Sequence, residues 1–393
     1  MGRQRFGTVD IVMLGSFGIW TRGTLQSRAL PFARALTRTT GLRFAIVTTP
    51  WDDPREAGVT GIVDDVLIYN TRSTTKSQFP AAVAEQLKLL RRLSPTLVHL
   101  MKPKAYAGLA GQLLTLTGGK PKLVVDYDDW EGDGGWNDRA GYPVAARRLF
   151  AFQERQLLHR ADGVTAASTL LAERARRMRN GNLNTRGVTY IPNGLEASWL
   201  ARLDGVGDRL LAPDPPELVL YSRFAEFTMS WLGGMLRKLD QKLERPVTLH
   251  IVGRDEPEVP ELSRLKLLEI DWHGFVQRDV VPAILSRASI ALYPYDDSLI
   301  NRSKQSVKLL ELMAAGCAVV ASDVGDIRRT GGDAVLAVQP GDAAVFACAV
   351  HRLIVEPARA AELGRRARTR AGQFTIESLA KRLHDVYCEC GVR

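Results

Sequence analysis

The 393-residue chain is predicted to fold as two successive doubly wound α/β domains. Short apolar runs alternate with amphipathic stretches, and this alternation restarts after a polar, proline-bearing stretch near the middle. The composition, 45% hydrophobic and 24% charged, is typical of a globular protein that is too long for one core. We therefore expect an N-terminal domain over 1–194, a C-terminal domain over 195–374, and a final segment, 375–393, that packs back on the first domain.

The first domain is expected to contain a mainly parallel sheet, because helices separate its apolar strands. Apolar residues at helical spacing predict helices over 81–93 and 146–160. The expected strands cover 9–15, 43–49, 65–70, 97–101, 122–127, 164–168 and 188–192.

The second domain follows a linker that is expected to end at Pro215–Pro216. Its expected strands cover 217–224, 247–252, 267–271, 288–293, 317–322 and 334–338, and a last helix covers about 375–388. Ligands of open α/β sheets bind at the carboxyl ends of the strands. Two such domains facing one another make a cleft, so we expect the chemistry in the loops that follow strands.

The net charge of +10 lies entirely in residues 1–200, since residues 201–393 are neutral. This asymmetry favours an acidic partner such as a phosphorylated acceptor or an anionic membrane. Arginine-rich composition from a GC-rich gene explains it equally well. Nucleic acid is the weaker option because no binding motif accompanies the charge. Arg147, Arg148, Arg155 and Arg160 share one predicted helix, which makes an anionic lipid acceptor a hypothesis.

Membrane-spanning and disulfide-stapled classes are not predicted. No apolar run reaches the roughly 18–20 residues that span a bilayer, and four cysteines in this length do not form a disulfide framework. Residues 9–15 resemble a first core strand more than a secretory signal. Cys388 and Cys390 alone make a weak metal site. We expect a cytoplasmic protein that can associate with the membrane from that side.

The loop after the first strand, GSFGIWTRG, carries Gly15, Gly18 and Gly23. Glycines let a backbone approach a ligand closely. Their spacing does not match the dinucleotide fingerprint, and no Walker lysine follows. A structural turn explains this loop about as well as a ligand does.

An acidic segment, VVDYDDWEGDGGWND, ends the strand expected at 122–127. Asp126, Asp128 and Asp129 could hold a divalent metal through oxygen ligands. They could equally bind sugar hydroxyls, with Trp130 or Trp136 stacking on a sugar ring. A solvated acidic loop is the plain alternative.

Several polar or glycine residues follow strands of the second domain. Arg223 ends the first of these strands, where a guanidinium suits bidentate phosphate binding. Gly253 ends the second strand, and Gly274, Phe275 and Val276 form a turn that could face a flat base. Tyr293, followed by Tyr295, closes the strand before the most distinctive segment.

That segment is ASIALYPYDDSLINRSKQSVKLLELMAAGCAVVASDVGD, residues 288–325. Lys308 and Glu311 share a helix face near a helix N-terminus, where free N–H groups and the dipole favour an anion. A cation, amide donors and a carboxylate together suit a ribose that carries phosphates. The alternative is a helix salt bridge worth roughly 0.2–0.5 kcal/mol.

These motifs resemble a GT-B glycosyltransferase, most similar to glycosyltransferase family 4, over nearly the whole chain. The last motif is the most specific. The matching segments are E-x4-HRADGVTAAS (154–168), VTYIPNGLE (188–196), LHIVG (249–253), HGFV (273–276) and VKLLELMAAGCAVVASDVGDI (307–327).

The resemblance implies transfer of a hexose-type sugar, with retention of configuration and no bound metal or cofactor. The donor would be a UDP- or GDP-sugar in the second domain, and the acceptor would bind the first. Arg223 and Lys308 would face the diphosphate, and Glu311 would hold the ribose. The other donor-site residues that we assign are Gly18, Gly253, Phe275, Val276, Tyr293, Ser306 and Val307.

Three positions depart from the family pattern. Ser303 replaces the first glutamate of the E-x7-E element, and Thr228 replaces a lysine. Asp128 stands where a histidine is usual, and we keep it with Arg223 and Lys308 as a catalytic candidate. Some members with such a replacement carry a lysine at the position of Lys308, so we expect an active subgroup.

Two other readings remain open. A GT-B nucleotide-sugar epimerase or hydrolase would use the same donor pocket without an acceptor sugar. A degenerate GT-B protein would bind the nucleotide sugar without catalysis. A nicotinamide dehydrogenase is a poor third, because the dinucleotide fingerprint is missing.

Overall fold

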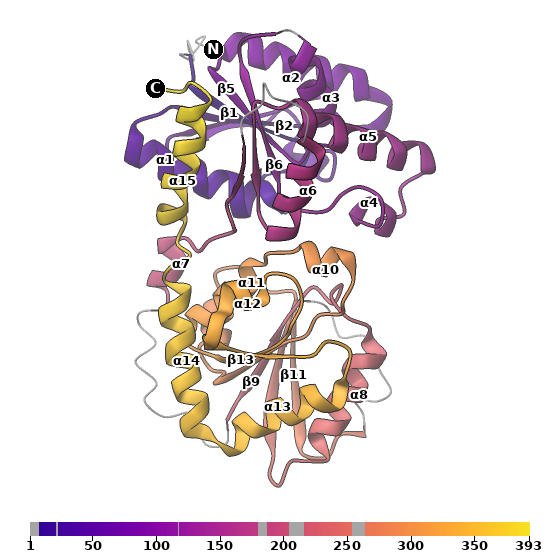
Figure 1. Cartoon of the computed structure of the whole chain (residues 1–393), viewed down its shortest axis with the longest axis vertical. Helices are drawn as coiled ribbons and strands as arrows, with labels where there is room; N and C mark the ends of the chain where they lie inside the picture. Colours follow the sequence, from indigo (N-terminus) through magenta and orange to yellow (C-terminus); the bar gives the residue numbers. More distant parts are fainter. Residues whose placement is uncertain (1–7, 21–22, 117, 180–186, 204–215, 254–263) are drawn as a thin grey trace. The chain divides into compact units, whose positions relative to one another are not determined.

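The computed structural model describes residues 8–20, 23–116, 118–179, 187–203, 216–253 and 264–393. Most of the expected linker, 204–215, lies outside the described residues. The chain divides into two compact units, one combining Met1–Asn193 with Ile376–Arg393 and the other formed by Gly194–Thr375. Each unit is built around its own sheet (Figure 1).

The first unit has a sheet in the order β3-β4-β2-β1-β5-β6-β7-β8. All neighbouring strands are parallel except β3 and β4. The seven strands predicted in this half are therefore confirmed. Their bounds are β1 Ile11–Gly15, β2 Phe44–Thr48, β3 Thr60–Val63, β4 Val66–Asn70, β5 Leu97–Met101, β6 Lys122–Tyr127, β7 Gly163–Ala166 and β8 Val188–Tyr190.

Strand β3 was not predicted because it is short and mostly exposed at the sheet edge. It lacks the buried apolar run that marks the parallel strands, and it pairs only with β4, in antiparallel fashion.

Helices cover both faces of this sheet (Figure 1). One face packs on α1 and α15 through a core that includes Ile11 and Met13, and α15 lies beside α1. The other face, with Val12 and Leu14, packs on α2, α3, α5 and α6. The helix bounds are α1 Leu30–Thr40, α2 Phe79–Leu93, α3 Ala105–Leu116, α4 Trp136–Arg139, α5 Val144–Arg160, α6 Thr169–Arg179 and α15 Ile376–Glu389.

The second unit has an all-parallel sheet in the order β11-β10-β9-β12-β13-β14. All six predicted strands are confirmed. Their bounds are β9 Leu218–Tyr221, β10 Val247–Val252, β11 Leu268–Gly274, β12 Ile290–Tyr293, β13 Ala318–Ser322 and β14 Val335–Val338.

Alternate residues of β9 face two separate cores. Leu218 and Leu220 pack towards α8 and α13, whereas Val219 packs towards α7, α9, α11, α12 and α14. The helix bounds are α7 Ala197–Ala201, α8 Met229–Asp240, α9 Val281–Leu285, α10 Leu299–Ser303, α11 Val307–Ala314, α12 Ile327–Gly331, α13 Ala343–Val355 and α14 Pro357–Ala371.

Each sheet reverses its strand order at its first strand. In the second unit β9 lies between β10 and β12, and in the first unit β1 lies between β2 and β5. Ligands of open α/β sheets bind beyond the carboxyl ends of the strands at such a switch point. This topology directs attention to the loops after β9 and β12 in one unit, and after β1, β5 and β6 in the other.

Within the described ranges, no helix combines the length and the apolar character required to cross a bilayer.

Candidate active site

The loop after β9 brings Ser222 and Arg223 to the switch point of the second unit. Gly253, at the end of β10, has φ 131° and lies so close that a Cβ there would meet the Ser222 carbonyl oxygen at 1.8 Å. Only glycine fits this approach. Gly253 therefore has a structural role, because it lets the ends of β9 and β10 lie side by side.

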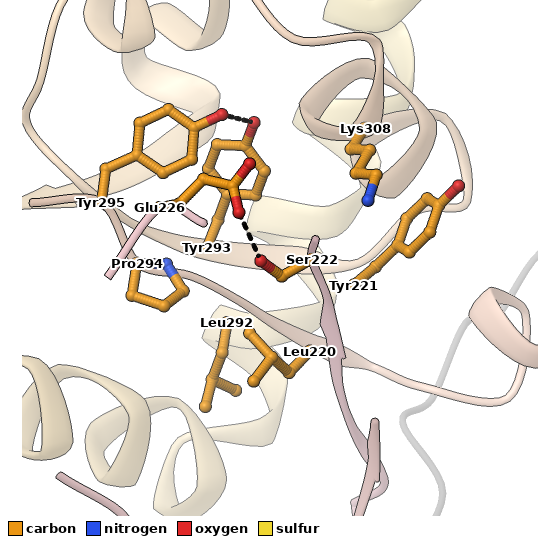
Figure 2. Close-up of a pocket in the computed structure, with 9 residues that line it drawn as sticks. All are labelled: Leu220, Tyr221, Ser222, Glu226, Leu292, Tyr293, Pro294, Tyr295 and Lys308. Atoms are coloured by element: carbon orange, nitrogen blue, oxygen red, sulfur yellow. Dashed lines mark hydrogen bonds between the residues drawn. The ribbon is translucent and has the colours of Figure 1, made fainter. Parts of the chain in front are cut away.

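Glu226 organises this loop from within. The Ser222 hydroxyl donates to its Oε2 at 2.9 Å, and the Lys304 ammonium donates to its Oε1 at 2.7 Å. Burial alone would raise the pKa of Glu226, but the Lys304 charge and these hydrogen bonds lower it to about 2. Figure 2 shows this carboxylate beside Ser222 in a small cavity floored by Leu220 and Leu292.

Lys308 enters the same cavity from the first turn of α11, and its ammonium lies 4.3 Å from the centre of the Tyr221 ring (Figure 2). Burial and repulsion from Arg223 lower its pKa to about 8, although Glu226 and Glu311 act in the opposite direction. No carboxylate among the described residues forms an ion pair with this ammonium. The free-energy cost of burying this charge is therefore only partly offset by the nearby carboxylates.

Arg223 is a second cation at this switch point. Its side chain is exposed, and within the described part of the chain the guanidinium has no hydrogen bond or ion pair. It lies near enough to Lys308 to lower that pKa. Two neighbouring cations that have no carboxylate partner among the described residues suit the binding of an anion at this switch point.

The N-terminus of α11 adds backbone donors to these cations. Ser306 is the N-cap, and its hydroxyl accepts from the amide of Lys308 at 3.3 Å. The first turn, beginning at Val307, presents the N–H groups and the positive dipole end that stabilise phosphate oxygens.

Glu311 lies one turn further along α11, and its side chain is only 5% exposed. Its carboxylate is 3.9 Å from the Arg278 guanidinium and interacts with Tyr221. Burial raises the pKa of Glu311, while Arg278 and Lys308 oppose that rise. A carboxylate of this kind can accept hydrogen bonds from two vicinal hydroxyls.

Phe275 stands at the tip of the turn after β11. Its side chain is 82% exposed, whereas Val276 is partly buried against the core. Gly274 has φ 64°, and its carbonyl accepts from the amide of Gly253 at 2.8 Å, which joins this turn to the end of β10. An exposed aromatic ring beside backbone polar groups suits contact with a flat base.

Tyr293 is buried beneath the site. Its hydroxyl lies 2.7 Å from that of Tyr295, and both rings line the cavity in Figure 2. Burial raises the pKa of Tyr293. Ser306, the N-cap of α11, opposes that rise, which places Tyr293 beside the α11 N-terminus.

The two departures of this unit from the family pattern have structural roles. The hydroxyl of Ser303 is buried and donates to the Ile300 carbonyl at 2.9 Å. Thr228 is the N-cap of α8 and accepts from the Trp231 amide at 3.3 Å. Thr228 replaces a lysine of the family pattern, and Lys304, adjacent to Ser303, supplies a cation to this end of the sheet.

In the first unit, side chains already occupy the amides of the loop that contains Gly18. The Gly18 amide donates to Asp52 at 2.6 Å, and the Phe17 amide donates to Thr48 at 3.1 Å. Glu56 accepts from the next two amides, at 2.8 and 3.0 Å. A phosphate would therefore have to replace Asp52 in order to reach the Gly18 amide.

Both carboxylate oxygens of Asp126, at the end of β6, already accept hydrogen bonds from protein side chains. Arg28 forms a bidentate pair with it at 2.8 Å for both bonds, and the Thr165 hydroxyl donates at 2.6 Å. Although burial opposes ionisation, the Arg28 charge and these hydrogen bonds lower its pKa. Asp126 is thus a structural anchor between β6, β7 and the segment that precedes α1.

Asp128 differs from its neighbour. One carboxylate oxygen accepts from the Thr24 hydroxyl at 2.5 Å, but Oδ1 is buried without a hydrogen-bond partner in the described structure. The Lys102 ammonium lies 3.8 Å from this Oδ1 atom. Burial raises the pKa of Asp128 to about 7, and repulsion from Asp129 and Asp126 adds to the effect. Such a carboxyl can accept or release a proton near neutral pH.

The remaining acids and tryptophans of this loop have protein partners. Lys102 pairs with Asp129, which also accepts from the Trp136 indole at 3.2 Å. The Arg174 guanidinium lies 3.6 Å from the centre of the Trp130 ring. These pairings occupy carboxylate oxygens that a metal ion would need and a tryptophan ring face on which a sugar would stack.

The topology defines two doubly wound α/β units, and comparison with known proteins assigns the family. The Glycosyl transferase 4-like domain matches residues 23–194, and the Glycosyl transferases group 1 domain matches residues 215–356. The fold is GT-B, and the chain belongs to the group 1 glycosyltransferases.

A curated relative supports the same assignment. TuaH of Bacillus subtilis (strain 168), named provisionally as a teichuronic acid biosynthesis glycosyltransferase, is 25% identical over 187 residues. That match spans 45% of this chain and only 44% of TuaH.

Solved structures of similar fold cover almost the whole chain. Sucrose-phosphate synthase from Thermosynechococcus elongatus has a TM-score of 0.72 at 19% identity, with 97% of this chain and 98% of that chain covered. Anabaena HepE in complex with UDP-glucose has a TM-score of 0.65 at 14% identity, with 96% and 99% covered. At these identities the likeness establishes the fold alone.

Sequence reasoning missed three residues of this site: Glu226, Arg278 and Lys304. Glu226 and Lys304 are 78 positions apart, so no local pattern links them. Arg278 follows the Gly274–Val276 turn, and this position next to a predicted site segment could have indicated that Arg278 belongs to the site.

Proposed function

We propose that the chain transfers a hexose-type sugar from a UDP- or GDP-sugar to an acceptor. The unit Gly194–Thr375 would bind the donor, and the unit that contains Asp128 would bind the acceptor. The observation that carries the proposal is a pair of cations at the β9 switch point, Arg223 and Lys308, which have no ion-pair partner in the part of the chain that the structure describes. HepE has been solved with UDP and with UDP-glucose, which supports the same class of donor here.

Breaking the sugar–phosphate bond sends its electron pair to the leaving diphosphate. Arg223, Lys308 and the first-turn amides of α11 would stabilise the negative charge that develops there. The α11 amides are held by the helix before the reaction, so they need no reorganisation during it. Glu311 would accept hydrogen bonds from the ribose, while Phe275 and Val276 would face the base. Gly18 stays a predicted donor contact.

Asp128 would serve the acceptor. Its unused oxygen and its pKa of about 7 suit it to hold an acceptor hydroxyl and to take up its proton. The transferred carbon would keep its anomeric configuration and no metal would be required, as the family resemblance implies. NMR of the product anomer, and assays in chelator, test these two points.

Incubation with UDP- and GDP-hexoses and a pool of sugar and lipid acceptors tests the proposal. A sugar-extended product that needs both substrates supports transfer. Sugar release or isomerisation without an acceptor would indicate the hydrolase or epimerase alternative. Binding with no product under any condition would indicate the degenerate one, which the replacements at Ser303 and Thr228 favour.

A peripheral contact with anionic membranes forms the last part of the proposal. On the outer face of α5, Leu149 is 41% exposed and Phe152 is 53% exposed, beside the exposed Arg148 and Arg155. Exposed apolar and basic side chains on one helix face suit an acidic lipid surface. A cytoplasmic location would fit the four free cysteines.

Vesicle flotation tests this contact. Binding to acidic vesicles at low salt, weakened in Phe152→Ser and Arg148→Glu and absent with neutral vesicles, supports it. Equal binding to neutral and acidic vesicles contradicts it.

A further inference from the structure

A second cluster of polar side chains lies away from the Lys308 cavity, at the β11 edge of the same sheet. His250 is on β10, and Asp271 and His273 are on β11. The Nδ1 atom of His250 lies 3.0 Å from Asp271 Oδ2 and 3.1 Å from His273 Nε2. The third distance, from His273 Nε2 to Asp271 Oδ2, is 3.3 Å.

The strand geometry explains this convergence. Asp271 is the register partner of His250, so both side chains leave the sheet on the same face. Between Ile251 and Val252 the register shifts, and His273 is the extra residue of the resulting bulge. Bulges re-aim side chains, and here the bulge accompanies a histidine turned towards the other two ligand atoms.

Glu217 fixes the proton arrangement of His250. Its carboxylate lies 2.8 Å from His250 Nε2, and a carboxylate can only accept a hydrogen bond. With a metal ion bound at Nδ1, Nε2 would keep the ring proton and donate it to Glu217. A carboxylate that orients a histidine in this manner is the usual second-sphere partner of a metal-bound imidazole.

From this geometry we propose that His250, Asp271 and His273 bind one divalent transition-metal ion, with zinc as the best match. Tetrahedral bonds of about 2.0–2.1 Å place ligand atoms about 3.3 Å apart, close to the separations found here. Two imidazoles and a carboxylate suit zinc better than magnesium or calcium, which prefer oxygen ligands.

The two ligands on β11 are more exposed than His250 on β10. His250 is fully buried, whereas the Asp271 side chain is 46% exposed and that of His273 is 20% exposed. The fourth position would therefore open to solvent and hold water. The ion would tie the edge strand β11 to β10, just before the turn at Gly274.

Metal titration of untagged, EDTA-treated full-length protein tests the proposal. We expect one zinc per chain, with affinity measured against a chromophoric chelator, and a tetrahedral visible spectrum when cobalt(II) replaces zinc. Asp271→Asn with His273→Gln should abolish both signals. Glu217→Gln keeps all three ligands and should weaken binding by about 10–100-fold.

His384→Ala is the control, because the His384 ring lies 3.6 Å from the Cys388 sulfur and is the obvious source of background binding. It should leave the stoichiometry and the spectrum unchanged. Zinc should also raise the melting temperature of the wild type but not that of the ligand variants. A wild type that binds no more zinc than the double variant, or whose binding disappears with His384→Ala, would overturn the proposal.

Discussion

Replacing Lys308 by methionine should make the protein more stable and much less active. The ammonium is partly buried near Arg223, has no carboxylate ion-pair partner among the residues that the structure describes, and has its pKa lowered from 10.5 to about 8. At about 1.36 kcal/mol per pKa unit, this shift is equivalent to at most about 3.4 kcal/mol of destabilisation. Partial exposure and the lost contact with Tyr221 reduce the expected gain to about 1–2 kcal/mol.

The sign follows from proton linkage. The folded-state pKa of Lys308 lies below its unfolded value, so the unfolded chain binds more protons between about pH 8 and 10.5. The destabilisation is fully present below pH 8 and disappears as the pH rises to 10.5. Lys308→Met should therefore unfold at a higher temperature at pH 7, by about 2–4 °C per kcal/mol, and should lose this advantage in alkali.

Catalysis should move in the opposite direction. If Lys308 stabilises the leaving diphosphate, its loss should lower turnover by about 10²–10³. Thermal unfolding without ligand and donor turnover, both at pH 7, measure the two effects. The exposed Lys242→Met is the matched control and should change neither. Turnover near that of the wild type, or a protein less stable than the wild type, would refute the reasoning.

Three further variants separate the proposed roles. Arg223→Ala should lower turnover by about 10²–10³ without lowering the melting temperature, because its side chain is exposed, forms no ion pair within the described structure and repels Lys308; the exposed Arg237→Ala is its control, and equal activities of the two would contradict the role. Glu311→Gln should raise the donor KM by about 10–100-fold, the loss expected for hydrogen bonds to a charged group, and an unaltered KM would remove the ribose assignment. The pH–rate profile of the wild type should rise near pH 7, where Asp128 loses its proton; Asp128→Asn should abolish that limb and lower turnover by about 10²–10⁴, and a limb that persists would assign the titration to another group.

The sheets could be predicted from the sequence because buried parallel strands are continuous apolar runs. Ile11–Gly15 and Ala318–Ser322 are buried at every position, and this burial is what the pattern detects. Thr60–Val63 escaped because an exposed edge strand needs no apolar run.

The candidate site was predictable where its residues are close in sequence or directly follow a predicted strand, as Arg223 follows β9. Lys308 and Glu311 share one turn of a helix, so their spacing alone indicated a common function. The Lys304–Glu226 pair and the His250–His273 contact depend on which strands become neighbours. The expectation that Asp126 binds a ligand overlooked Arg28, 98 residues away, which pairs with it.

Calorimetric titration of UDP and GDP into the wild type and into the Arg223→Ala/Lys308→Met double variant tests the central claim most directly. The account predicts that the wild type binds at least one of the two nucleotides and that the double variant binds it at least 100-fold more weakly, at about 1.5–3 kcal/mol per charged contact. Equal affinities, or no binding of either nucleotide by the wild type, would contradict it.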